Sequence, residues 1–359
     1  MHTAIMIDQP RFRLERAWFN RTVVGLVSAG VQVTRIIPES DPDDDRVSLT
    51  ASVQVRSANL PWSRRASRDR LAAQLKSGNV SLIHAMGMGV WSDAVEVAGM
   101  LEVPVVLDVW SKRGLGHIGR FAKSRVVAAV FAASEGMAGE LRKKIEPGLV
   151  CTIPIGVYIP EVDKEVLCSP ERGWAAILSG QGVKTNDLAN LIDGFASAHA
   201  RYPECMLFAD LDHKTSARAW DLGKRRGILD SFSLIPSLDQ NRRLVMKADI
   251  LLVPSATGRS SSFLLEAMAS PMVAVMAEDP LVSQPADQRG GVLLREIESS
   301  NWSAALEKIL TQRDFGQQLA EGARSWVAEK HPMSLQVSRM YEAYETVLTG
   351  GSVRLPGER

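Results

Sequence analysis

The sequence predicts an α/β protein built from two doubly wound domains. Short, nearly continuous apolar runs alternate with longer helical patterns along the chain, which is typical of parallel strands covered by helices on both faces. This alternation occurs twice, on either side of a polar stretch at 161–173. A length of 359 residues also suits two domains of ordinary size. We therefore expect a domain over 1–165 and a second over 166–333.

Each domain is expected to contain a series of strands separated by amphipathic helices. Residues Leu188, Leu191, Ile192 and Phe195 recur at helical spacing in 186–203, and the segment 334–350 has the same apolar spacing. The expected strands of the first domain are 3–7, 31–37, 80–84, 103–109, 126–132 and 149–155. Those of the second domain are 174–180, 205–210, 232–236, 248–254, 272–277 and 291–295.

The composition is that of a soluble globular protein without a strong global charge. Apolar residues make up 45% and charged residues 23%, and the net charge of +1 gives no field that favours nucleic acid. The three cysteines are scattered, so neither a zinc site nor a disulfide framework is expected. No apolar stretch has the length of a membrane span, and no signal peptide is visible. We expect a cytoplasmic protein.

Candidate binding residues follow the expected strand 248–254. Ser260, Ser261 and Ser262 precede a helix, where free backbone N–H groups and the helix dipole attract anions. Arg259 can add a charge-assisted contact to a phosphate, and Glu266 can accept hydrogen bonds from a ribose. These features together describe a nucleotide diphosphate site. The alternative is a serine cap followed by a glutamate that complements the helix dipole.

Other candidate residues lie at strand ends, where ligands bind in open parallel sheets. Gly180, Gln181 and Lys184 belong to a short loop after a strand, and Lys184 is either a diphosphate contact or a solvated lysine. In the first domain, His84 is expected to follow a strand and to position an acceptor or a sugar, unless it is structural. Asp108, near the end of the next strand, is its candidate partner or a cap for 111–113.

Two basic stretches of the first domain, 62–76 and 111–125, have apolar residues between their charges. They are either solvated helix faces or contacts for anionic lipid or a phosphorylated acceptor. No RNA-recognition motif accompanies them, and we expect no nucleic-acid partner.

The loop and helix at 258–275, GRSSSFLLEAMASPMVAV, resemble the signature of family 4 glycosyltransferases, which have the GT-B fold. Glu266-Ala267-Met268-Ala269 matches the centre of that signature, and Pro254-Ser255 matches the strand end before it. The segments 130–144, 151–160, 177–198 and 238–255 resemble other stretches of the family in the same order, so the similarity covers most of the chain.

This resemblance implies two Rossmann-like domains that face each other across a cleft, with the last helix returning to the first domain. It implies a retaining hexosyltransferase that uses a nucleotide-sugar co-substrate and neither a cofactor nor a metal. The second domain would bind the donor, through Gly180, Gln181, Lys184, the loop 259–262 and Glu266. The first domain would bind the acceptor, a glycan or a lipid-linked sugar, near His84 and Asp108. Enzymes of this kind also suggest peripheral contact with the inner face of a membrane.

The sequence departs from the family at polar positions. The first glutamate of the signature falls on Gly258, an expected arginine falls on Gln181, and a common histidine falls on Trp110. The glycine-rich N-terminal loop is replaced by Gln9-Pro10-Arg11. We expect Arg259 to replace the arginine missing at position 181. The alternative function is an inactive, glycosyltransferase-like binding or scaffolding subunit, and an epimerase on the same fold is a more distant one.

Overall fold

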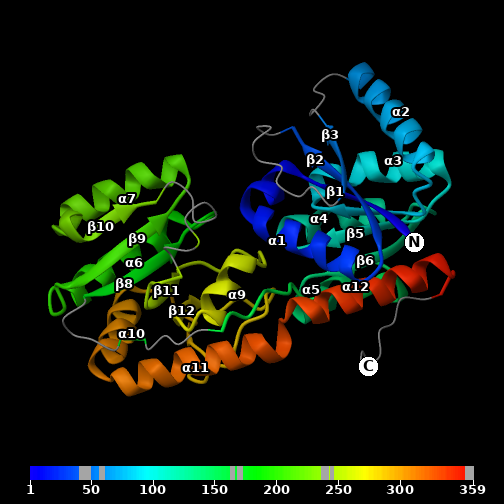
Figure 1. Cartoon of the computed structure of the whole chain (residues 1–359). Coiled ribbons are helices and arrows are strands. Elements are labelled where there is room, and N and C mark those ends of the chain that lie inside the picture. The colour runs from blue at the N-terminus through cyan, green and yellow to red at the C-terminus, as the bar shows by residue number, and fades with distance from the viewer. Residues whose placement is uncertain are drawn as a thin grey trace. The chain divides into compact units, whose positions relative to one another are not determined.

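The computed structural model describes residues 1–39, 50–55, 61–161, 166–167, 173–235, 242 and 246–351, and the side chains of 61–63 are not described. The chain forms two compact units (Figure 1). The first contains Met1–Gly156, Leu281–Ser283 and the C-terminal segment from Met333, and the second contains Val157–Pro280 and Gln284–Pro332. Most of the polar stretch 161–173, with the expected domain boundary at 165, lies outside the described residues.

The first unit is a parallel sheet of seven strands in the order β3-β2-β1-β4-β5-β6-β7. Its helices fall into two layers, because the alternating residues of each strand face opposite sides of the sheet. One layer packs on the core that contains Met6, Ile83 and Leu107, and α1 and α12 contact each other in the other layer. The strands are β1 (His2–Ile7), β2 (Gln32–Pro38), β3 (Ala51–Val55), β4 (Leu82–Met86), β5 (Val105–Val109), β6 (Val127–Ala132) and β7 (Val150–Thr152). The helices are α1 (Gln9–Ser28), α2 (Pro61–Ser77), α3 (Trp91–Leu101), α4 (Lys112–Phe121), α5 (Glu135–Arg142) and α12 (Met333–Leu348).

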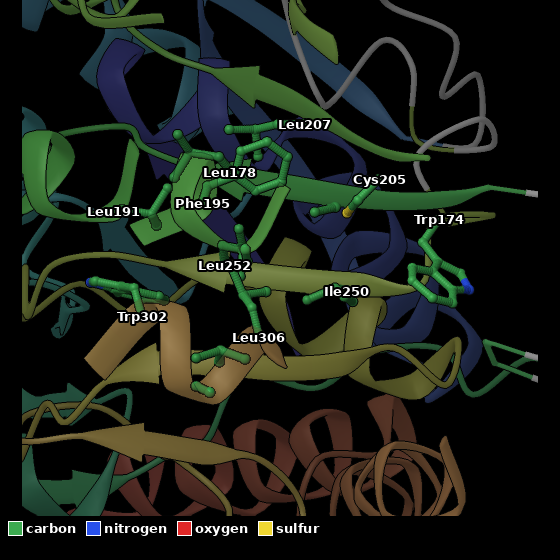
Figure 2. Packing of buried hydrophobic residues seen from close by; sticks show 14 of the residues in the cluster. Trp174, Leu178, Leu191, Phe195, Cys205, Leu207, Ile250, Leu252, Trp302 and Leu306 are labelled. Atoms are coloured by element: carbon green, nitrogen blue, oxygen red, sulfur yellow. The ribbon is translucent and has the colours of Figure 1, made fainter. Parts of the chain in front are cut away.

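The second unit is a parallel sheet of six strands in the order β10-β9-β8-β11-β12-β13. Its main core lies between this sheet and helices α6 and α10, and includes Leu178, Phe195, Leu252 and Trp302 (Figure 2). The strands are β8 (Trp174–Ser179), β9 (Cys205–Asp210), β10 (Phe232–Leu234), β11 (Ile250–Val253), β12 (Val273–Ala277) and β13 (Val292–Leu294). The helices are α6 (Thr185–His199), α7 (His213–Arg226), α9 (Ser262–Ala269), α10 (Ser299–Thr311) and α11 (Arg313–Lys330).

These sheets confirm the predicted fold class, and every predicted apolar run overlaps a strand. Strand β3 was not predicted. Its sequence ASVQV lies at the sheet edge with mostly exposed side chains, so it lacks the continuous apolar run of a buried strand. Among the described residues, no helix is long and apolar enough to cross a membrane.

Helix α12 belongs to the first unit although it follows the whole second unit in sequence. Two buried polar side chains attach it. Gln336 accepts a hydrogen bond from the Trp18 indole at 3.0 Å and another from the Gly156 N–H. About two turns further along the helix, the Tyr344 hydroxyl lies 2.7 Å from Nδ1 of His84 in β4. Both side chains are nearly inaccessible to solvent, so these contacts fix the position of α12 on the sheet.

The substitution Tyr344→Phe removes the hydroxyl group but keeps the aromatic ring of this side chain. We expect Tyr344→Phe to destabilise the first unit by about 1–3 kcal/mol, because it leaves a buried His84 nitrogen without its partner. Hydrogen exchange at the amides of α12 and β4 measures the change. Tyr341→Phe, at a partly exposed position of the same helix, is the matched control and should cost no more than about 0.5 kcal/mol. Equal protection in the two variants would contradict the anchoring role of Tyr344.

Candidate functional site

In the second unit, the strand order reverses between β8 and β11, the position at which ligands bind in open α/β sheets. A small crevice of about 20 Å³ lies there, at the carboxyl ends of both strands. Its lining includes Gln181, Arg259 and Ser261, so the structure brings these predicted residues together. The complete lining is Ser179, Gln181, Val183, Val253, Pro254, Ser255, Thr257, Arg259, Ser261 and Leu264.

Arg259 connects the two loops of the crevice. Its Nη2 donates a hydrogen bond to the backbone oxygen of Gln181 at 2.8 Å. The Gln181 side chain does not extend this positive charge, because its amide donates to the buried carboxylate of Asp210 at 2.8 Å. The guanidinium of Arg259 therefore lies at the loop in which the arginine expected at position 181 is missing.

The remaining residues of the β8–α6 loop surround the crevice without lining it. Lys184 is exposed and directly precedes α6, and its backbone N–H donates to the Ser255 hydroxyl at 3.1 Å. That hydroxyl in turn donates to Asp187 at 2.6 Å. Gly180 has a packing role, because a Cβ at this position would lie 2.3 Å from Leu211.

The serine loop begins helix α9 as predicted, with Ser261 as the residue before the helix. No side-chain hydrogen bond caps this helix start or that of α6, whereas the carboxylate of Asp212 caps α7. Ser260 is only 8% exposed, and its hydroxyl has no hydrogen-bond partner within the part of the chain that the structure describes. A buried hydroxyl without a hydrogen-bond partner destabilises the folded state. The Ser260 hydroxyl can therefore still form a hydrogen bond with a ligand.

Glu266 is buried in α9 and already has a protein partner. Its Oε1 lies 2.5 Å from Nη1 of Arg242, and Nη2 of the same arginine is 3.4 Å from the Ser262 hydroxyl. Glu266 does not line the crevice, so the expected contact between its carboxylate and a ribose stays a prediction. The sequence analysis missed Arg242 as a site residue, although it lies in the segment 238–255 that carries the family resemblance.

The sequence also gave no indication of a second site residue, the carboxylate of Asp279. Gly258, at the position of the first glutamate of the signature, adopts a left-handed φ of 61°. Its N–H donates to the buried Asp279 at 2.6 Å. Asp279 follows strand β12, and the rule that ligands bind at strand ends identifies this position. The loop of Arg259 is therefore held by an acidic side chain from another strand end.

In the first unit, the expected location of His84 at a strand end was wrong. β4 continues beyond His84 to Met86, because Ala85 and Met86 are apolar and pair with both β1 and β5. His84 is therefore inside the strand, with 0% of its surface exposed, and lies beneath Tyr344 of α12. A catalytic role of His84 stays a prediction, and its burial restricts any such role to an effect through Asp108 or Tyr344.

Asp108 lies in β5 and forms an ion pair with Arg11 at 2.6 Å. The guanidinium of Arg11 is buried and lies over the rings of Trp18 and Trp110, 4.7 and 5.1 Å from their centroids. Burial raises the pKa of Asp108, and the charge of Arg11 acts in the opposite direction. Arg11, in the segment that replaces the glycine-rich loop, thus fills the space beside Trp110.

The same cluster keeps His84 neutral. Burial, followed by the charge of Arg11, lowers the pKa of His84 from 6.5 to about 3. Its Nε2 is 3.9 Å from Asp108, too far for a hydrogen bond, while Nδ1 contacts Tyr344. A neutral ring is therefore the form compatible with the folded first unit.

The basic stretches of the first unit lie on α2 and α4. Arg64, Arg65 and Arg70 of α2 are exposed, whereas Arg68 is held by ion pairs with Asp93 and Glu96 of α3. The side chain of Trp62 lies outside the described residues. Among the described residues, no group of three or more His, Cys, Asp and Glu side chains is positioned to hold a metal ion.

The buried state of His84 has a consequence for the dependence of stability on pH. Because the folded pKa of about 3 is below the ordinary value of 6.5, the unfolded chain binds a proton first as the pH falls. This group should therefore reduce the free energy of unfolding below pH 6.5, by up to about 1.4 kcal/mol per pH unit, until the pH nears 3. NMR of the imidazole measures its protonation directly. A protonation midpoint above about pH 5 in the folded protein would contradict this assignment.

No known family model matches the chain, and no curated protein sequence matches it. Solved structures are similar to it over almost the whole length. One is a glycosyltransferase from Rickettsia africae, with a TM-score of 0.75, 13% identity, and coverage of 98% of this chain and 99% of the other. Another is HepE from Anabaena in complex with UDP-glucose, with a TM-score of 0.78, 12% identity, and coverage of 96% and 99%. The lipopolysaccharide outer core galactosyltransferase WaaB has a TM-score of 0.69, 14% identity, and coverage of 98% and 99%. With these likenesses, the sheets and their strand orders establish that the chain has the GT-B fold.

Proposed function

We propose that the protein is a glycosyltransferase that binds a nucleotide-sugar donor at the carboxyl ends of β8 and β11. The observation that carries this proposal is the hydrogen bond from Arg259 to the Gln181 backbone, because it holds a guanidinium over the crevice at the reversal of strand order. Arginine suits a diphosphate, since its planar group donates two parallel hydrogen bonds to phosphate oxygens. The bound nucleotides of structures with the same fold support the same ligand class.

Two helix starts strengthen the case for an anion at this position. α6 and α9 both begin beside the crevice without a side-chain cap, so their first N–H groups and dipoles can act on a diphosphate. The buried hydroxyl of Ser260 supplies a further donor, and Lys184 supplies a positive charge at the exposed end of the same loop. These groups would hold the diphosphate both before and after the sugar leaves.

In the proposed reaction, the bond between the sugar and the diphosphate breaks, and an acceptor hydroxyl forms a bond to the same carbon. The diphosphate leaves with an additional negative charge, which Arg259 and Lys184 stabilise, and the hydroxyl proton is released to it or to solvent. Retention at that carbon and independence of metal follow from the family resemblance. A glycan or lipid-linked acceptor, and peripheral membrane contact through α2 and α4, complete the proposal.

Glu266 would recognise the ribose. Each of its two carboxylate oxygens can accept more than one hydrogen bond, so Glu266 can accept from a diol while it pairs with Arg242. Arg242 would then orient the carboxylate, while Asp279 would hold the loop in which the family has a sugar-contacting glutamate. The proposed site is therefore stronger in its contacts to the nucleotide than in its contacts to the sugar.

The contact between Arg259 and the diphosphate can be tested by binding. We expect Arg259→Ala to weaken the affinity for UDP about 10- to 100-fold, the effect of losing hydrogen bonds to a charged group, and to leave uridine binding unchanged. Calorimetric titration measures both affinities. Arg218→Ala, on the exposed side of α7, is the matched control and should leave both ligands unaffected. Equal losses for UDP and uridine would show that Arg259 does not reach the phosphates.

The ribose contact can be tested with two ligands on one protein, so that any loss of stability cancels. Wild-type protein should bind UDP about 5- to 30-fold more tightly than 2′-deoxy-UDP, and Glu266→Gln should remove most of this preference. The measurement is the ratio of the two dissociation constants. If the preference persists in the glutamine variant, Glu266 is a structural partner of Arg242 only. Binding of intact UDP-sugars without any turnover would instead favour the inactive, nucleotide-binding alternative.

A further inference from the structure

The start of α6 is tied to the end of another strand. Lys184 is the residue before this helix, and Asp187 is the third residue within it. In a common arrangement, a glutamate at that third position accepts a hydrogen bond from the backbone N–H of the residue before the helix. Aspartate is one carbon shorter, and here the hydroxyl of Ser255, which follows β11, lies between the two groups. It accepts from the Lys184 N–H at 3.1 Å and donates to Asp187 at 2.6 Å.

These contacts commit the only proton of the Ser255 hydroxyl. A serine hydroxyl has one proton to donate, and the Asp187 carboxylate accepts it. Ser255 is 4% exposed, so it lines the crevice without a proton to donate to a ligand. A hydrogen bond of this length to a carboxylate is stronger than one between neutral groups. Asp187 therefore fixes the orientation of Ser255, and Ser255 holds the backbone of Lys184.

The loop between β8 and α6 turns sharply before it reaches Lys184. The Val183 N–H donates to the Gly180 oxygen at 3.1 Å, and Gly182 has a left-handed φ of 77°, as the third residue of a type II turn does. This turn sets the direction of the chain. The next N–H along the chain, that of Lys184, then donates to Ser255, which places the start of the helix.

Two contacts thus join the loop after β8 to the segment after β11, its neighbour in the sheet. Arg259 holds the Gln181 oxygen at one end of the loop, and Ser255 holds Lys184 at the other. In the proposed donor site, Lys184 and Arg259 supply the positive charges. The separation between these charges therefore depends on both contacts.

We propose that Asp187 is a positioning residue of the donor site. Through Ser255 it fixes the start of α6 and the place of Lys184, and it does not itself contact the ligand. Its own negative charge repels a diphosphate, so it favours binding only through the position of other groups. The part of this inference that concerns ligand binding rests on the proposed function, whereas the placement of Lys184 by Asp187 does not.

Hydrogen exchange of the Lys184 amide tests this placement without any ligand. Asp187→Ala removes the acceptor of the Ser255 proton, so exchange should become about tenfold faster, the effect of losing one hydrogen bond to a charged group. Asp187→Asn keeps a side-chain oxygen that can accept this proton and should change the rate less than about threefold. Asp193→Ala, which removes the ion-pair partner of Arg226 in the same helix, is the matched control and should leave this amide unchanged. Equal exchange in Asp187→Ala and the control would overturn the proposal.

The affinity for UDP separates a positioning role from a purely electrostatic one, because the two roles predict opposite signs. Both Asp187 variants remove a negative charge, which by itself tightens the binding of an anion. We expect Asp187→Ala nevertheless to weaken UDP binding about fivefold, whereas Asp187→Asn should bind UDP as tightly as the wild type or up to about fivefold more tightly. Tighter binding by both variants would overturn the proposal.

A double-mutant cycle tests whether Asp187 acts through Lys184. In protein that carries Lys184→Ala, the further change Asp187→Ala should no longer weaken UDP binding, since the side chain that it positions is absent. An undiminished loss in that background would overturn the proposal. Wild-type protein that fails to bind UDP would refute the proposed donor site, while the exchange of the Lys184 amide still decides the role of Asp187.

Discussion

The requirement that a parallel sheet be covered on both faces governs this molecule. Backbone groups in the interior of such a sheet must all be paired, and both faces must be removed from water by helices. The paired strands of each sheet are all parallel, so the chain returns to the same end of the sheet before each new strand begins. All carboxyl ends of the strands thus lie at one edge, and loops far apart in sequence meet there. The crevice of Arg259 lies at such an edge.

Charged side chains at the strand ends have different partners in the two units. In the second unit, Arg259 donates a hydrogen bond to the backbone oxygen of Gln181, and Asp279 accepts one from the neighbouring Gly258 N–H. In the first unit, Asp8 and Asp108 are the corresponding strand-end groups, and Asp108 is paired with a buried arginine. Removing one member of such a pair leaves an uncompensated buried charge, so Arg11 and Asp108 depend on each other in the folded first unit.

The sequence was sufficient for the fold and for part of the site. Continuous apolar runs and helical spacing located the strands, because burial on both faces leaves a strong pattern. The sequence pattern did not predict β3, whose edge position allows polar residues. It also placed the end of β4 at His84, whereas the strand continues for two more residues. The partners of Glu266 and Gly258 could not be predicted, since Arg242 and Asp279 lie on other elements and their pairing depends on packing. The position of Arg259 beside the loop of Gln181 was predictable because both loops follow strands that are neighbours in the sheet, while its role in binding stays a prediction.

The attachment of α12 has a consequence for how the chain is made. The first unit begins at the first residue but includes the helix that ends at Leu348, whereas the second unit is complete at Pro332. During synthesis, the ribosome therefore releases the whole second unit before the last helix of the first. Until that helix emerges, His84 and the neighbouring apolar surface of the nascent sheet lack their cover. The first unit can therefore complete its native packing only after that helix has been synthesised.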